Sequence, residues 1–145
     1  MPHARTRIVY FVAVVVVIVI GVVSRVLGTN NMLIDKYLGD ALYAIMLYLL
    51  LSIWIIDQTP IQKSYETAGL MLLIETFQLT NIPLAMNASH QIIVRMVARL
   101  LGTTFSWLDM VAYLAGIIVI TLVEHTFFRT KTSPESFVQH DANRD

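Results

Sequence analysis

The chain has 145 residues, of which 57% are hydrophobic and 14% are charged, and its ten basic and ten acidic side chains cancel. Soluble domains average about 45–50% apolar and about 25% charged residues, so this composition indicates a protein embedded in lipid. The balanced charge provides no basic field for nucleic acid, and the absence of cysteine excludes disulfides, thiolate catalysis and cysteine-based zinc sites.

The first apolar run, Ile8 to Val23, follows Arg5 and Arg7, as it would in a secretory signal peptide. No small-x-small cleavage pattern comes after it, and further apolar runs follow. Backbone groups in lipid must be satisfied within their own segment, so a run of this kind forms a helix despite its many β-branched residues. We therefore predict an uncleaved first transmembrane helix over 8–27, ended by Gly28.

Three more spans are predicted, over 40–56, 65–79 and 105–128. Asp40 is expected to cap the second span at its N-terminus. The third is the least apolar of the four, because it contains Glu75 and Gln78. Several spans are shorter than the roughly 20 residues of a full crossing, so we expect flanking side chains to snorkel or the bilayer to thin.

The connection between the third and fourth spans contains an amphipathic segment, 89–101, which Ser89 is expected to cap. Polar side chains occupy one face of this segment and apolar side chains another. The polar face has Gln91, Arg95 and Arg99, and the apolar face has Ile92, Ile93, Met96, Val97, Leu100 and Leu101. Such a helix either lies at the membrane interface or re-enters the bundle.

The predicted fold is all-α, an integral membrane four-helix bundle with this additional amphipathic or re-entrant helix. We expect one transmembrane domain over 1–130 and a flexible polar tail over 131–145. Basic residues near the helix ends favour cytoplasmic N- and C-termini in a bacterial inner membrane. The inner side then holds Arg5, Arg7, Lys63, Arg129 and Lys131, and the outer side holds Arg25, Lys36, Arg95 and Arg99.

Polar side chains are expected to converge near the outer membrane surface and form a ligand-binding site. Its predicted members are Arg25, Asp40, Glu75, Gln78, Arg95, Arg99 and Asp109. A carboxylate at membrane depth usually faces protein or water, so Glu75 either binds a ligand, proton or ion, or pairs with an arginine of this set. The arginines at 95 and 99 either bind an anionic phosphate in a bidentate fork or snorkel to headgroups.

Asp109 either complements the dipole of the fourth helix or pairs with one of these arginines. Gly69 and Gly116 are predicted to be helix-packing positions. The four histidines lack metal-ligand spacing, and no catalytic serine elbow or phosphate-binding glycine loop occurs. We therefore expect no metal and no cofactor, and the sequence assigns no catalytic residue.

Several strings in this sequence resemble a known family. They are Gly21-Val22-Val23-Ser24-Arg25, Lys36-Tyr37-Leu38-Gly39-Asp40-Ala41-Leu42-Tyr43, Glu75-x-x-Gln78 and Phe105-x-Trp107-x-Asp109-x-x-x-Tyr113-x-x-Gly116. The chain is similar, over roughly Arg7 to Val123, to small bacterial membrane proteins catalogued as domain of unknown function 2809. The Gly-Asp-Ala-Leu-Tyr segment is the most specific part, and the resemblance implies a fold more than an activity.

That family is in turn similar in layout to VanZ-like proteins, and VanZ itself is associated with glycopeptide (teicoplanin) resistance. Those proteins also have four helices, a Glu-x-x-Gln in the third, then Arg and Asp before a last helix that contains glycine. The resemblance implies that Glu75, Gln78, Arg95 or Arg99, Asp109 and Gly116 correspond. This chain departs from the pattern by having Ala112-Tyr113 where those proteins usually place an asparagine.

The leading functional hypothesis is an envelope protein, not demonstrably enzymatic, that binds an anionic lipid or amphiphile in an outer polar pocket. In it Arg95 and Arg99 hold the anion, while Glu75 and Asp109 orient them. One alternative is a small, oligomeric proton- or cation-linked transporter that uses Glu75. Another is a membrane enzyme in which Glu75 or Asp109 is the acid or base for a lipid-linked substrate. Expected partners are membrane lipids, an anionic or lipid-linked small molecule and a second copy of the chain, with no nucleic acid.

Overall fold

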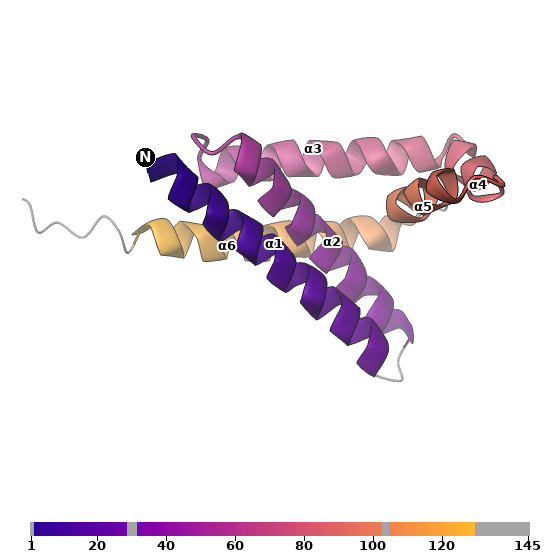
Figure 1. Ribbon diagram of the computed structural model, residues 1–145, viewed down its shortest axis with the longest axis horizontal. Coiled ribbons are helices and arrows are strands. Elements are labelled where there is room, and N and C mark those ends of the chain that lie inside the picture. Colours follow the sequence, from indigo (N-terminus) through magenta and orange to yellow (C-terminus); the bar gives the residue numbers. More distant parts are fainter. Residues whose placement is uncertain (1, 29–31, 103–104, 130–145) are drawn as a thin grey trace, which may run out of the picture.

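The computed structural model describes residues 2–28, 32–102 and 105–129, and the regular structure in these residues is entirely helical (Figure 1). The prediction of an all-α chain is thus confirmed. The helices are α1 (Pro2–Leu27), α2 (Met32–Trp54), α3 (Pro60–Gln78), α4 (Ile82–Asn87), α5 (Ile92–Leu101) and α6 (Trp107–Arg129).

The four long helices alternate in direction along the chain (Figure 1). α2 packs against both α1 and α6, and α3 lies along α6. The start of α1 and the end of α6 lie at one end of the molecule, and the short helices α4 and α5 lie at the other. The end of α1 and the start of α2 diverge from α4 and α5, so the molecule is forked at this second end.

Three of these helices are long and apolar enough to cross a membrane, namely 4–27 in α1, 35–54 in α2 and 107–126 in α6. α1 buries only Tyr10 and Val14 among its described side chains, and most of its other valines and isoleucines are exposed. A helix whose apolar side chains face away from the protein is suited to lipid. α3 contains Lys63, Glu66 and Glu75 and is less apolar, so its crossing of the membrane stays a prediction.

The sequence predicted the end of α1 correctly but not the start of α2. α1 ends at Leu27 as predicted, and Gly28 follows with a φ of +44°, a conformation that favours glycine. α2 begins at Met32, so Asp40 lies inside the helix and its expected role as an N-cap is wrong. The apolar pattern begins later than the helix, because residues 32–39 mix polar and apolar side chains.

α3 begins at Pro60, five residues before its predicted start, because the chain caps the helix there. The Thr59 hydroxyl accepts a hydrogen bond from the Gln62 backbone N–H (3.3 Å). The Gln62 side chain accepts one in return from the Thr59 backbone N–H (3.0 Å). This capping box, followed by proline in the first turn, satisfies backbone donors that an apolar pattern does not reveal.

The connection after α3 contains a helix that the sequence did not predict, α4. α5 begins at Ile92, and Ser89 accepts a hydrogen bond from the Gln91 backbone N–H (3.2 Å) before the helix starts. Ser89 is therefore a turn residue and the prediction that it caps α5 is wrong. The amphipathic helix itself is present over Ile92–Leu101, and the predicted tail, 131–145, lies outside the described residues.

Two apolar clusters hold the long helices together. One joins α1 to α2, and the other joins α2, α3 and α6. Their buried members are Tyr10, Val14, Tyr48 and Leu49 in the first, and Ala44, Met71, Tyr113 and Ile117 in the second.

The two glycines predicted to mediate helix packing differ in the structure. A side chain at Gly116 of α6 would collide with the Ala41 backbone of α2, so this glycine permits the close α2–α6 crossing. Gly69 has open space around it, and its predicted role in packing is wrong within this chain.

Candidate functional site

Three carboxylates gather at the forked end of the molecule, and we call Asp40, Glu75 and Asp109 the acidic cluster. They come from the first half of α2, the end of α3 and the start of α6. Because these helices alternate in direction, those three segments meet at one end. Asp40 interacts electrostatically with both other carboxylates, with Lys36 and with Arg25. The predicted convergence of polar residues is therefore seen for this part of the set.

Glu75 is the most enclosed member of the acidic cluster, with 0% of its surface exposed. Neither carboxylate oxygen has a hydrogen-bond partner among the described residues. The Tyr113 hydroxyl and the Ser106 backbone N–H lie close enough to interact with it, but neither forms a hydrogen bond of standard geometry. A buried carboxylate without partners is costly, so this position requires a physical explanation.

Gln78 lies one turn after Glu75 and connects α3 to the end of α5. Its Nε2 donates a hydrogen bond to the Leu101 carbonyl oxygen (2.7 Å), whereas its Oε1 is buried and has no partner in the described chain. Gly102, with a φ of +81°, leaves room for this amide, since a Cβ there would come within 2.8 Å of Nε2. Gln78 therefore fixes the α5 end next to the acidic cluster.

Asp109 forms an ion pair with Lys36, with 2.8 Å between Oδ1 and Nζ. The predicted pairing of Asp109 with Arg95 or Arg99 is not seen. Lys36 was placed on this side by its charge but was not included in the predicted site. The sequence could have indicated that Lys36 belongs to this site, because Lys36 and Asp40 are four residues apart and so share a face of α2.

None of the three predicted arginines pairs with a carboxylate of the acidic cluster. Arg25 is exposed at the end of α1 and is in electrostatic range of Asp40. Arg95 is half-buried and Arg99 exposed on α5, and neither forms an ion pair with any residue that the structure describes. The expectation that Glu75 and Asp109 orient these two arginines is therefore wrong.

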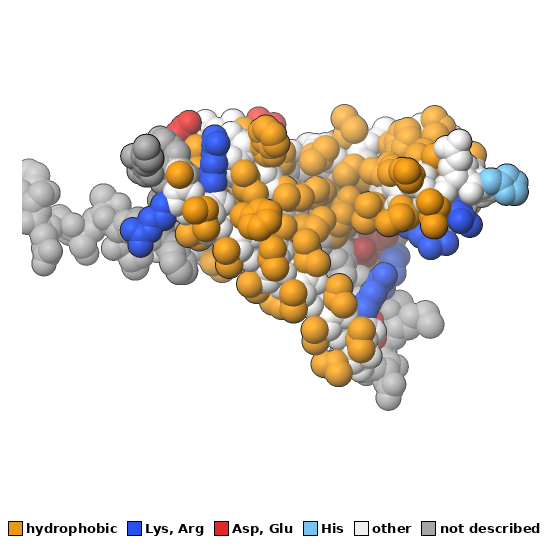
Figure 2. All heavy atoms as spheres, in the orientation of Figure 1, with side chains coloured by type: hydrophobic (Ala, Val, Ile, Leu, Met, Phe, Trp, Pro, Cys, Tyr) orange, Lys and Arg blue, Asp and Glu red, His pale blue; other side chains and the backbone are white. Residues whose placement is uncertain are grey.

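Figure 2 shows a notch in the outline of the molecule between the α1–α2 end and the α4–α5 end. Blue basic side chains lie on both sides of the notch in this view, with a red acidic group between them. Hydrophobic side chains cover most of the remaining visible surface. Charged side chains thus lie at the two ends of the molecule in this view, and the surface between them is suited to lipid.

A second buried polar cluster lies at the opposite end, and the sequence analysis missed it. Lys63 Nζ donates hydrogen bonds to Glu124 Oε1 (2.7 Å) and to the Tyr10 hydroxyl (2.9 Å). Tyr10 donates to the same Glu124 oxygen (2.7 Å). These contacts join α1, α3 and α6. Glu124 inside the predicted fourth span was the available signal, because a charge in lipid needs a partner, and Lys63 next to the predicted third span could supply one.

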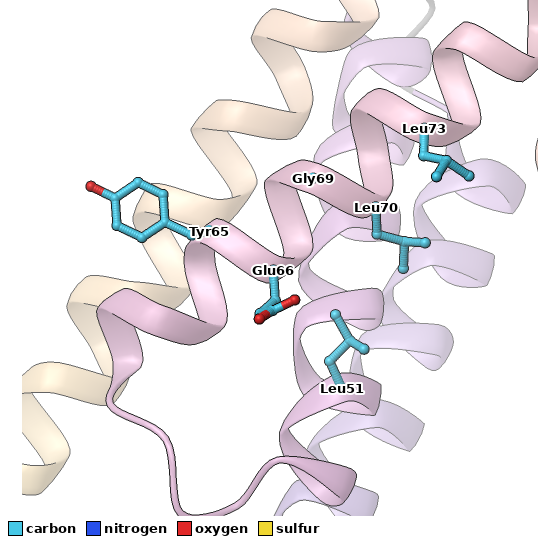
Figure 3. A pocket seen from close by; sticks show the side chains of 6 residues that line it. All are labelled: Leu51, Tyr65, Glu66, Gly69, Leu70 and Leu73. Atoms are coloured by element: carbon cyan, nitrogen blue, oxygen red, sulfur yellow. The ribbon is translucent and has the colours of Figure 1, made fainter.

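An open groove of about 470 Å³ lies between α2 and α3 (Figure 3). Its lining residues are Leu51, Tyr65, Glu66, Gly69, Leu70 and Leu73. The Glu66 side chain points toward the gap between the two helices, and Tyr65 points away from it. The groove contains none of the predicted site residues, and its mostly apolar lining resembles an ordinary lipid-facing surface.

Within the described ranges no group of three histidine, aspartate or glutamate side chains is arranged to hold a metal ion. No curated protein and no solved structure matches the chain. The resemblance to VanZ-like proteins therefore stays a prediction. A family model described as "Protein of unknown function (DUF2809)" matches residues 29–117, more than half of the chain, from before the start of α2 into α6. The chain belongs to this family, DUF2809.

Proposed function

We propose that the protein resides in a bacterial cytoplasmic membrane and that α3 crosses the bilayer together with α1, α2 and α6. With 19 residues at about 1.5 Å each, α3 approaches the roughly 30 Å of the hydrocarbon core. Its Lys63 and Glu75 are both 0% exposed, so two of its charges are turned away from lipid. Arg5 and Arg7 favour a cytoplasmic N-terminus, which places α4 and α5 at the outer surface.

In this orientation α5 binds anionic lipid headgroups at the outer membrane surface. The observation that carries this proposal is an outward apolar face beside two arginines that form no ion pair with the described residues. Ile93 and Leu100 on that face are 73% and 65% exposed, and Ile92 and Met96 are exposed with them. Such a face inserts below the headgroups, and arginine side chains beside it are then positioned to bind phosphate.

The acidic cluster determines where an anion is accommodated. Asp40 and Asp109 repel an anionic group, and Lys36 already pairs with Asp109. The headgroup is therefore expected on the α5 side, against Arg95 and Arg99, rather than inside the cluster. This differs from the initial hypothesis, in which the carboxylates belonged to the anion pocket.

The test is lipid selectivity of the purified protein in nanodiscs of phosphatidylglycerol mixed with phosphatidylcholine, read by native mass spectrometry. A basic residue near an anionic surface contributes about 1 kcal/mol, so Arg95→Ala/Arg99→Ala should weaken retention of phosphatidylglycerol by about 30-fold. Arg5→Ala/Arg7→Ala, at the other end, is the matched control. Equal retention by the wild type and the Arg95→Ala/Arg99→Ala variant would reject the proposal.

A proton- or cation-linked transporter is the second candidate, and the unpartnered Glu75 carboxylate favours it. A transporter needs a buried group that binds and releases its ion. Proteoliposomes with an internal pH dye should then show protein-dependent proton flux that Glu75→Gln abolishes. Flux that is the same in both proteins would rule out this use of Glu75.

A further inference from the structure

The acidic cluster has more negative than positive charge, and Glu75 is the member left without compensation. The titratable and charged groups around Glu75 are Lys36 and Asp40 from α2, and Asp109 and Tyr113 from α6, while Arg25 of α1 interacts with Asp40. Lys36 contacts Asp109, while Arg25 is exposed at the end of α1. No described cation contacts Glu75 itself.

An ionised carboxylate in this position would combine two unfavourable terms. Removing it from water costs several kcal/mol, which the nearby Tyr113 hydroxyl and Ser106 N–H do not offset with hydrogen bonds of standard geometry, and two neighbouring carboxylates add like-charge repulsion. Both terms disappear if Glu75 binds a positive charge. Either a proton or a metal ion can supply that charge.

The surroundings of Glu75 favour the proton. Its side chain is fully enclosed, and the described residues include no set of three ligands arranged for a metal ion. A proton needs no cavity, and it converts one carboxylate oxygen into a hydroxyl donor. The buried Oε1 of Gln78, one turn away on α3 and without a hydrogen-bond partner among the described residues, offers an acceptor.

A route for this proton leads through Asp40. Asp40 is half-buried, interacts with Glu75 and has one buried oxygen without a hydrogen-bond partner. Lys36, one turn before it, is 46% exposed, so this face of α2 reaches the surface at the fork. Water at the fork can protonate Asp40, and Asp40 returns to a carboxylate when it passes the proton to Glu75.

We propose that Glu75 is a proton-binding site, occupied in the resting protein, that exchanges with water at the fork through Asp40. This inference goes beyond headgroup binding by α5 and does not depend on it. A proton-linked transporter would need such a site, but occupancy is measured at equilibrium. The absence of proton flux would therefore not contradict the proton-binding site.

The test is infrared spectroscopy of the full-length protein in nanodiscs at neutral pH, in choline chloride. The wild type should show the carbonyl-stretch band of a protonated carboxylic acid. Glu75→Gln should abolish this band, and Glu66→Gln, which changes an exposed carboxylate on the same helix, should retain it. If Glu75→Gln does not fold, ¹³C-glutamate labelling of the wild type must shift the band.

In choline chloride, three results would overturn the proposal: the absence of the band at neutral pH, an unchanged band in Glu75→Gln, and no isotope shift with labelled glutamate. A fourth is the disappearance of the band when sodium chloride replaces choline chloride, because sodium would then displace the proton and be the occupant. Transfer of the wild type into D₂O should move the band quickly and Asp40→Asn should slow this exchange; equal rates would remove Asp40 from the route.

Discussion

The replacement Gly116→Ala should separate the two most closely packed long helices. A Cβ at this position would lie 3.1 Å from both Cα and the carbonyl carbon of Ala41, and closer still to the Ala41 carbonyl oxygen. Ordinary van der Waals contact begins at about 3.4 Å, and these atoms are backbone that no side-chain rotation can move away. The α2–α6 crossing must therefore open.

The magnitude follows from two opposing terms. Overpacking of a tight contact typically costs 1–3 kcal/mol, whereas replacing a helical glycine by alanine gains about 0.5–1 kcal/mol in backbone entropy. A backbone obstacle places the cost in the upper part of its range, so the net loss of unfolding free energy should be about 1–2 kcal/mol. Reversible unfolding in mixed detergent micelles, followed by helical circular dichroism, measures it.

Gly69→Ala is the matched control for this prediction. Gly69 is also in the middle of a long helix, but its surroundings are open, so only the favourable entropy term applies. This variant should be as stable as the wild type or more stable by up to about 1 kcal/mol. If both alanine variants have the same stability, the close approach of α2 and α6 at Gly116 is wrong.

Three further predictions concern single contacts. Lys63→Met leaves the Glu124 carboxylate buried without its cation and should lower the unfolding free energy by about 3–5 kcal/mol. The double variant Lys63→Met/Glu124→Met should regain most of that loss, and equal losses in the two variants would refute the ion pair. Lys36→Met should cost about 1 kcal/mol or less in the same assay because Lys36 is half-exposed, and a loss equal to that of Lys63→Met would contradict this ranking. Thr59→Ala should cost about 1 kcal/mol and Thr59→Ser close to none, and equal losses would argue against the capping box of α3.

Much of the helical architecture could be predicted from the residues because lipid leaves an apolar run few alternatives to a helix. The end of α1 and the amphipathic character of α5 followed from periodicity and from Gly28. The start of α2 and the start of α3 did not follow. In both cases the helix extends into polar residues, which hydropathy does not register: a capping box stabilises the start of α3, and Lys36 in the early part of α2 pairs with Asp109.

The sequence by itself determined an all-helical, apolar chain and the segments that contain its ionic side chains, since both depend on composition and local periodicity. Only the tertiary structure decided which of those side chains meet. Asp109 pairs with Lys36 rather than with an arginine of α5, and Lys63 meets Glu124, 61 residues away. Such partners depend on how each helix is rotated and crossed against its neighbours, and close contacts such as Gly116 on Ala41 set that geometry.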